Sequence, residues 1–397
     1  MDHLNDRIRD LELPSGHSLL TWRLQQQDSE PPSNYNSDTD EPTPRQRNPQ
    51  EKAKQEVVLD QDFAFSKRSV SRDDFQTLCV LGRGAFGKVF LVKHEKSKEL
   101  YAMKVLKKAS LVLHGRQATQ AKTERQILEE VRHPFIVKLC YAFQTPTELH
   151  MILDYAVGGE LFRHLDHEGM FSEDMVVFYA AEICCALDHL HSLGIMYRDL
   201  KPENCLLDME GHIVLTDFGL SKVAVDGKTN TICGTAEYMA PEILKGLEYD
   251  ITVDWWSLGI LIYDMLTGSP PFSSSNRKKT MDAILTKKIP MPYYLTQDAK
   301  DILSKLLRKN PNARLGAKPK KADAIRKHRF FRTIDWIALE NRQLDPPIVP
   351  IVTEPEKAEN FDPVFTAEAL VGSPENHDVQ ANSHFLNFSY VDASIPL

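Results

Sequence analysis

Apolar residues follow two periodicities along the chain, and the change from one to the other predicts two lobes. Up to residue 155, short β-rich runs predict strands at 75–81, 89–94, 100–106, 136–144 and 149–155, with one helix at about 117–131. From residue 160 onward, helical spacing predicts helices at 173–193, 254–266, 280–287 and 298–307. We expect an α+β protein with a small antiparallel-sheet lobe at about 75–155, a larger helical lobe at about 159–331, and a ligand cleft between them.

Both ends of the chain differ from this globular middle. Residues 1–74 are expected to form a disordered extension, because Gln, Ser, Pro, Asn, Asp and Glu dominate residues 25–54 and leave little to bury. Scattered leucines between residues 4 and 20 leave a short partner helix open. After residue 331, prolines exclude long helices while aromatic pairs recur. We therefore expect an extended tail over residues 332–397 that docks through its rings.

Composition narrows the class of protein. Apolar residues make up 42% and charged residues 26%, which is typical of a globular protein, and the net charge of −8 argues against general attraction to nucleic acid or anionic membranes. The six scattered cysteines form no C-x-x-C pair and are typical of buried thiols in a reducing compartment. Without an 18-residue apolar run or a signal-peptide pattern, we expect no membrane span and a cytoplasmic location, with the nucleus as a further possibility.

A glycine cluster lies between the first two predicted strands. Gly82, Gly84 and Gly87 have the G-x-G-x-x-G spacing, which dinucleotide-binding folds share. A dinucleotide site would open a helix after the third glycine, whereas residues 88–93 are strand-like. An antiparallel hairpin of this kind lets backbone amides approach phosphate oxygens. The alternative is a glycine-rich hairpin without a ligand.

A lysine within a predicted strand requires a partner of opposite charge. Lys104 stands in an apolar strand about twenty residues after the glycines, where it is costly unless it meets an anion. A phosphate, or Glu124 on the following helix, would satisfy it. The alternative is a surface ion pair of little consequence.

The strongest single signal is Tyr-Arg-Asp-Leu-Lys-Pro-Glu-Asn at residues 197–204. Proline within this segment prevents a helix, so its polar side chains project from a loop. Asp199 would orient and deprotonate a hydroxyl, Lys201 would neutralise a phosphoryl group in transfer, and Asn204 would ligate a hard cation. Asp217, in an Asp-Phe-Gly segment after a predicted strand, adds a second oxygen ligand.

In this order, and with Ala-Pro-Glu at residues 240–242, these motifs resemble the signature set of eukaryotic protein kinases. The resemblance covers residues 75–331. It implies the bilobal protein-kinase fold, ATP and Mg²⁺ as cofactors, and Asn204 and Asp217 as the metal ligands. Tyr197 stands where many kinases have His, at a position that supports the loop by packing.

The resemblance also implies how ATP would lie. Lys104, held by Glu124, would grip the α- and β-phosphates, and the adenine would lie between Val89 and Ala102 on one side and Leu206 on the other. The implied ATP-binding residues are Leu81, Gly82, Arg83, Gly84, Ala85, Phe86, Gly87, Lys88, Val89, Ala102, Lys104, Leu153, Asp154, Tyr155, Ala156 and Leu206. The implied catalytic residues are Asp199, Lys201, Lys104 and Glu124.

Narrower features resemble the AGC kinases. Tyr197, the segment 231–235 and the aromatic tail carry this likeness, and stretches such as YAMKVLKKA are most similar to the ribosomal protein S6 kinases with a single kinase domain. In the tail, residues 361–366 resemble the stretch that crosses the nucleotide cleft, and residues 385–390 resemble the hydrophobic motif that docks on the small lobe.

Regulation is implied by the same resemblance. The implied phosphosites are Thr231, Ser373 and Ser389, with upstream kinases acting on the first and the last. Arg198 and Lys222 are the expected cations for a phosphate on Thr231.

The substrate class is implied in the same way. Glu160, Glu203 and Asp264 align with acidic positions that read arginines before the acceptor residue. We expect a monomeric serine/threonine kinase that acts on basic protein substrates and is linked to growth signalling and translation.

Other hypotheses remain open. One is an AGC kinase with a different substrate, and another is a pseudokinase scaffold that binds nucleotide without transfer. A nucleic-acid-binding module is a third, based on a basic cluster that lacks interleaved aromatic residues, so specific nucleic-acid binding is not expected. The cluster consists of Lys318, Lys320, Lys321, Arg326, Lys327 and Arg329.

Overall fold

The computed structural model describes residues 70–84, 87–113, 116–223, 228–231, 233–370 and 385–395. The predicted disorder and partner helix before residue 70, and the implied sites Ala85, Phe86 and Ser373, lie outside the described residues. The strands are β1 (Phe75–Gly84), β2 (Gly87–His94), β3 (Leu100–Lys107), β4 (Leu139–Gln144), β5 (Glu148–Asp154), β6 (Gly159–Glu160), β7 (Ile195–Met196), β8 (Cys205–Leu207), β9 (Ile213–Leu215), β10 (Lys222–Val223) and β11 (Tyr390–Val391). The helices are α3 (Lys108–Leu113), α4 (Arg116–Glu130), α5 (Leu161–Glu168), α6 (Glu173–Ser192), α7 (Pro241–Leu244), α8 (Thr252–Thr267), α9 (Arg277–Thr286), α10 (Gln297–Leu306), α11 (Lys321–Arg326), α12 (Trp336–Glu340) and α13 (Pro363–Thr366).

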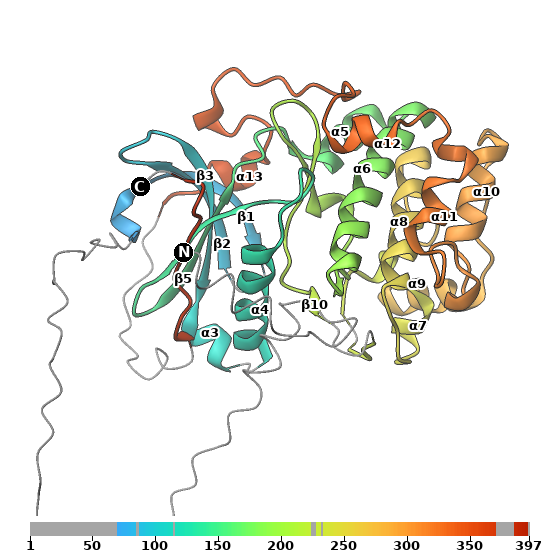
Figure 1. Ribbon diagram of the computed structural model, residues 1–397, viewed down its shortest axis with the longest axis horizontal. Helices are drawn as coiled ribbons and strands as arrows, with labels where there is room; N and C mark the ends of the chain where they lie inside the picture. Colours follow the sequence, from blue (N-terminus) through green and yellow to red (C-terminus); the bar gives the residue numbers. More distant parts are fainter. Residues whose placement is uncertain are drawn as a thin grey trace, which may run out of the picture.

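A twisted antiparallel sheet forms the small lobe, with α4 beside it (Figure 1). The strand order is β1-β2-β3-β5-β4-β11, so the strand nearest the end of the chain completes an edge of the first sheet. Pairing buries the edge that β4 would otherwise expose. The expected α+β architecture of a sheet lobe followed by a helical lobe is therefore confirmed.

Two central helices organise the large lobe. Almost every side chain of α8 and most of those of α6 are buried, as expected for helices that are apolar all round. In the part of the chain that is described, no helix is both long and apolar enough to cross a membrane. All six cysteines fall in the described ranges, and each is a free thiol.

Element boundaries differ from expectation where tertiary contacts decide them. The predicted strand at 136–144 begins only at Leu139, because Ile136 forms a parallel bridge with Leu215 of the large lobe instead. Helix α9 begins at Arg277, before the expected residue 280. The side chain of Asn276 caps its first turn, which is too polar to carry an apolar signal.

The tail runs along both lobes (Figure 1). Helix α12 lies against α6 in the large lobe, and α13 lies against β1 in the small lobe. The helices between residues 332 and 370 are short, in agreement with the prolines there. The tail therefore brings residues from the end of the sequence to the rim of the cleft.

Candidate active site

Two glycines of the first hairpin leave space for a ligand, and the third is required by packing. Gly84 pairs with Gly87 across the antiparallel strands β1 and β2. A Cβ atom added at Gly82 would meet nothing within 4 Å, whereas one added at Gly87 would lie 1.8 Å from the carbonyl oxygen of Val105. The hairpin that the sequence predicted is therefore present, and the helix of a dinucleotide site is not.

An ion-pair network, buried at Glu124 and half-exposed at Asp217, joins the two lobes. Nζ of Lys104 lies 2.6 Å from Oε1 of Glu124 on α4 and 2.9 Å from Oδ1 of Asp217. Burial by itself would lower the pKa of Lys104, but Asp217 and Glu124 outweigh it and raise that pKa. Burial raises the pKa of Glu124, whereas the lysine charge lowers the pKa of Asp217. The network keeps a charged lysine beside the hairpin, where it can meet a phosphate.

The loop after β7 brings together three polar side chains. Nζ of Lys201 donates to Oδ2 of Asp199 at 2.8 Å, and Nδ2 of Asn204 donates to the same carboxylate at 3.0 Å. The backbone N–H of Thr216 donates to the carbonyl oxygen of Asn204 at 3.0 Å, which ties this loop to the segment carrying Asp217. Because the amide nitrogen of Asn204 is engaged, its side-chain oxygen is the atom left to ligate a cation.

Mg²⁺ fits this donor set. Within the described ranges, no group of three or more His, Cys, Asp or Glu side chains forms a metal cage. Mg²⁺ keeps several waters and commonly binds one or two protein oxygens together with substrate phosphates. Asn204 and Asp217 supply donors of that kind.

A buried carboxylate holds the loop in place. Asp254 of α8 is fully buried and accepts hydrogen bonds from the backbone N–H groups of Tyr197 and Arg198, at 3.0 and 2.8 Å. Arg198 has φ +70°, a conformation that a non-glycine residue adopts only when its surroundings enforce it. Sequence reasoning did not identify Asp254, although an acid inside the apolar helix pattern was a usable signal.

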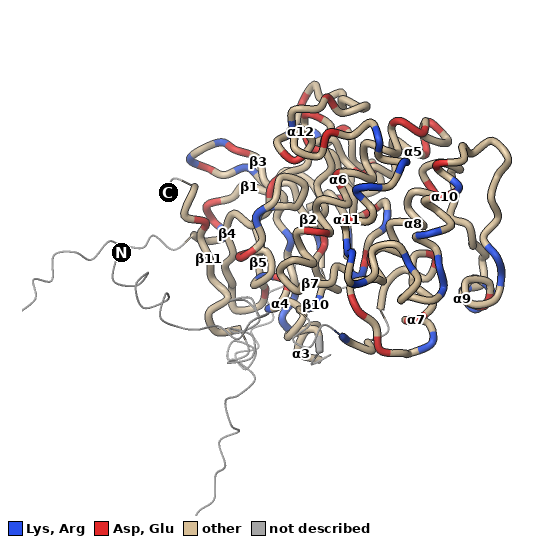
Figure 2. The backbone as a smooth tube through the Cα atoms, turned by 45° about the vertical axis from the view of Figure 1, so that its right-hand side comes forward, with Lys and Arg blue, Asp and Glu red and all other residues tan. Residues whose placement is uncertain are grey.

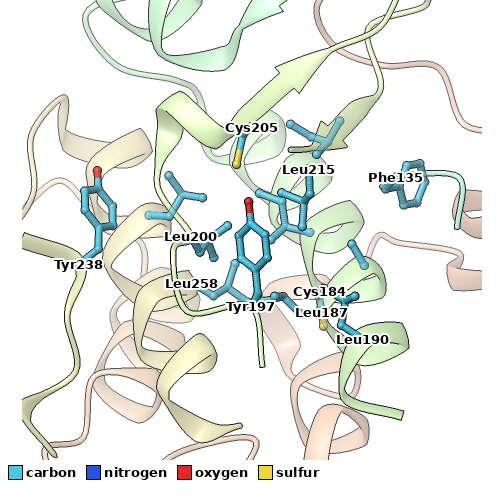
Figure 3. Close-up of a cluster of buried hydrophobic side chains, with 14 of the residues drawn as sticks. Phe135, Cys184, Leu187, Leu190, Tyr197, Leu200, Cys205, Leu215, Tyr238 and Leu258 are labelled. Atoms are coloured by element: carbon cyan, nitrogen blue, oxygen red, sulfur yellow. The ribbon is translucent and has the colours of Figure 1, made fainter. Parts of the chain in front are cut away.

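Tyr197 supports the same loop by packing, as the sequence predicted. Figure 3 shows its ring among Leu200, Cys205 and Leu215 in the core of the large lobe. The ring lies 5.2 Å from that of Phe218, and its hydroxyl donates to the carbonyl oxygen of Thr216.

The segment around Thr231 contacts the expected cations only indirectly. The Arg198 guanidinium donates to the hydroxyl of Tyr249 at 3.1 Å, and that hydroxyl donates to the backbone oxygen of Thr231 at 2.6 Å. Nζ of Lys222 donates to Oγ1 of Thr229 at 2.9 Å, and this oxygen lies 3.5 Å from Oγ1 of Thr231. Lys222 is therefore linked to the Thr231 hydroxyl through Thr229, whereas Arg198 is linked to the Thr231 backbone oxygen through Tyr249.

The three acids expected to read arginine influence one another. Burial and the charge of Glu203 raise the pKa of Glu160. Burial raises the pKa of Asp264 to about 6, although the hydroxyl of Tyr238 donates to this carboxylate. Asp264 is buried, so its charge would add to the negative potential around Glu160 and Glu203 from below the protein surface.

Tail residues reach both the cleft and the far edge of the sheet. The ring of Phe361 stacks on Tyr155 with centroids 5.7 Å apart. Phe385 and Phe388 are buried in the hydrophobic core. Ser389 is exposed, and its carbonyl oxygen accepts a hydrogen bond from Arg125 of α4 at 3.2 Å. The tail thus contacts the helix that carries Glu124.

A pocket of about 680 Å³ lies beside the segment that joins the lobes, with Tyr155 and Val157 in its lining. Its lining includes Asp154 and Tyr155, which were expected to bind ATP, together with Cys140 and Arg342. The thiol of Cys140 donates to the Asp154 carboxylate at 3.2 Å. The side chain of Asp154 therefore lines this pocket, whereas Ala102 and Val89 pack in the cluster next to Leu81.

The site combines a glycine hairpin, a paired lysine, a carboxylate-bearing loop and a second loop acid, all between two lobes. This combination is the architecture of a phosphotransferase. The model of the protein kinase domain matches residues 75–331, and the chain belongs to that family. This finding confirms the predicted kinase fold.

Individual relatives make the family likeness more specific. Ribosomal protein S6 kinase beta of Caenorhabditis elegans is 48% identical over 333 residues, which are 82% of this chain and 60% of the relative. Human ribosomal protein S6 kinase alpha-3 is 50% identical over 85% of this chain and 46% of the relative, and human alpha-2 is 51% identical over 83% and 45%. The predicted resemblance to this branch of the AGC kinases is confirmed, and the chain spans about half the length of these curated relatives.

Proposed function

We propose that this chain is a serine/threonine protein kinase that transfers the γ-phosphate of ATP, with Mg²⁺, to substrates carrying arginine before the acceptor. The contact of Lys104 with both Glu124 and Asp217 is the main support for this proposal. It joins the lysine beside the glycine hairpin to the helix that carries Glu124 and to the acid of the Asp-Phe-Gly segment. Asn204 and Asp217 would hold Mg²⁺. The metal would neutralise phosphate charge during transfer.

The remaining steps fall to the loop residues. Asp199 would orient the acceptor hydroxyl and take its proton, and Lys201, 2.8 Å from Asp199, would balance charge on the transferred group. Glu203, Glu160 and the buried Asp264 would attract the arginine of a basic protein, such as the ribosomal protein S6 to which the relatives' names refer.

The test is transfer of radioactive γ-phosphate from ATP to a serine peptide with upstream arginines. The expected result is Mg²⁺-dependent labelling that falls by several orders of magnitude in Asp199→Asn and falls for the peptide without arginine. Nucleotide binding without labelling of any peptide would overturn the proposal and favour the pseudokinase alternative.

We also propose that phosphorylation of Thr231, Ser373 and Ser389 by upstream kinases controls this activity. A phosphate on Thr231 would lie within the network of Arg198 and Lys222. Thr231→Ala is expected to retain ATP binding and lose most transfer, measured by nucleotide titration and peptide labelling. Unchanged turnover would contradict this switch.

A nucleic-acid function is less well supported. Two members of the predicted basic cluster already pair with acids: Arg326 with Asp188 and Glu340, and Arg329 with Asp298. In Figure 2, basic and acidic positions are interspersed over both lobes. A nucleic-acid site is usually marked by a basic stripe of one sign, whereas the charged positions in this view alternate in sign.

A further inference from the structure

Two cations face each other at the base of the glycine loop. Arg83 on β1 and Lys88 on β2 are direct cross-strand partners, one pair before Gly84 and Gly87. Like charges directly opposite each other destabilise a strand pair. An anion between them would therefore stabilise the hairpin at the point where it must close over a phosphate.

The tail supplies that anion. Oε1 of Glu368 lies 2.7 Å from Nε of Arg83, and its Oε2 lies 2.8 Å from NH2 of Arg83 and 3.1 Å from Nζ of Lys88. The guanidinium is thus held at two of its nitrogens, by a hydrogen bond from NH2 and by an ion-pair contact at Nε. The two cations also hold the pKa of Glu368 below its usual range.

Neighbouring contacts fix the segment that carries Glu368. Helix α13 packs on β1, and the Asp362 side chain caps it by accepting from the N–H of Val364 at 2.9 Å. The N–H of Glu368 donates to the carbonyl oxygen of Phe365 at 3.0 Å. The carboxylate is therefore presented by a folded turn, which limits the entropy lost when the ion pairs form.

We infer that Glu368 is a positioning residue of the ATP site, a tail carboxylate that ties both strands of the glycine hairpin together and holds the loop over the phosphates. This inference rests on the proposed kinase function. It predicts that the carboxylate acts on ATP binding through the hairpin, without contact with ATP.

The chain provides a matched control. Glu356 is also a tail carboxylate paired with a lysine of β2, because its Oε1 lies 2.7 Å from Nζ of Lys93. Lys93 stands at the opposite end of that strand from the glycine loop. Comparison of Glu368→Gln with Glu356→Gln therefore separates an effect on the loop from the general loss of a tail ion pair.

The experiment measures binding of a fluorescent ATP analogue, the KM for ATP and hydrogen exchange over residues 82–91 in the full chain. Glu368→Gln should weaken analogue binding and raise the KM for ATP by about fivefold, with kcat and peptide KM nearly unchanged, because two partly exposed pairs are lost. Exchange at 82–91 should become faster. Glu356→Gln should leave all of these values at those of the unsubstituted chain.

A background that lacks the partners tests the route of the effect. In Arg83→Gln/Lys88→Gln, adding Glu368→Gln should cause no further change in analogue affinity. Equal affinity and exchange in Glu368→Gln and the unsubstituted chain, or tighter binding in the variant, would overturn the inference. Analogue binding and hydrogen exchange need no phosphoryl transfer, so they test the role of Glu368 by themselves. Failure of the kinase proposal would be seen separately, as the absence of peptide labelling by the unsubstituted chain.

Discussion

Asp392 is predicted to anchor the end of the tail to the small lobe. Its side chain is 4% exposed, with Oδ2 2.7 Å from NH2 of Arg132 and Oδ1 3.7 Å from Nζ of Lys138. Its backbone N–H donates to the carbonyl oxygen of Cys140 at 2.9 Å, which continues the pairing of β11 with β4. The isosteric change Asp392→Asn removes the charge and keeps the shape.

The expected loss follows from these contacts. A hydrogen bond to a charged group is worth about 1.5–3 kcal/mol, and an exposed ion pair about 0–1 kcal/mol. Because Arg132 is 42% exposed and Lys138 is 30% exposed, we expect a loss between these limits, about 1–2 kcal/mol, in the free energy of tail docking. That corresponds to a five- to thirtyfold smaller docking constant.

The pH dependence of the anchor has a definite sign. Burial by itself would raise the pKa of Asp392, but hydrogen bonds from Ser394 and the charges of Lys138 and Arg132 lower it to about 2. An acid whose pKa is depressed in the folded state stabilises that state above its unfolded pKa. The contribution should be constant from pH 8 to pH 5 and should fade as the pH drops from about 4 to 2.

Hydrogen exchange of residues 385–395 and of β4 measures the docking. Asp392→Asn should exchange five- to thirtyfold faster in these segments at pH 7, with little change in the large lobe. Glu95→Gln is the control, because it removes an exposed pair with Lys98 on the same lobe in which no tail residue takes part. Equal protection in Asp392→Asn and the unsubstituted chain would refute the reasoning.

Three further predictions follow from buried groups. Asp264→Asn should raise the free energy of unfolding at pH 7.5 by up to about 3 kcal/mol and by little at pH 4. The pKa of about 6 makes the charged carboxylate a cost that grows between pH 4 and 6, and denaturant titrations with no difference at pH 7.5 would contradict this. Phe385→Ala, at a fully buried ring, should weaken tail docking by about 3–5 kcal/mol and make the tail more sensitive to limited proteolysis. A cleavage rate equal to that of the unsubstituted chain would contradict this prediction. Tyr197→Phe should cost about 1–3 kcal/mol in urea unfolding because the Thr216 carbonyl loses its donor, and an unchanged midpoint would count against that bond.

Sequence reasoning predicted which residues meet in the candidate active site because these residues are concentrated in short segments. Asp199, Lys201 and Asn204 are five residues apart or less, and the proline between them excludes a continuous α-helix, so their meeting in one loop was predictable. The short 3₁₀ helix Pro202–Asn204, which begins at that proline, was not predicted. The pairing of Lys104 with Glu124 was also expected, because a lysine in an apolar strand needs an anion and the next helix offers one.

Boundaries and long-range partners were less predictable. Ile136 and Val137 are apolar and β-branched, as is typical of a strand, yet Ile136 bridges to Leu215 in the other lobe. Strand β11 was not predicted, since Tyr390 and Val391 give no period-two signal and become a strand only by pairing with β4.

The sequence by itself determined the division into a sheet lobe and a helical lobe and the docking aromatics of the tail, because periodicity and local spacing encode these features. The kinase motifs were identified by their resemblance to a known signature set. Only the tertiary structure decided that Asp254 holds the catalytic loop, that Glu368 joins Arg83 and Lys88, and that Asp392 meets Arg132. An isolated carboxylate in a sequence carries no information about which distant cation it will meet. Packing of the whole chain brings such groups within hydrogen-bond distance and removes the water that would otherwise screen them.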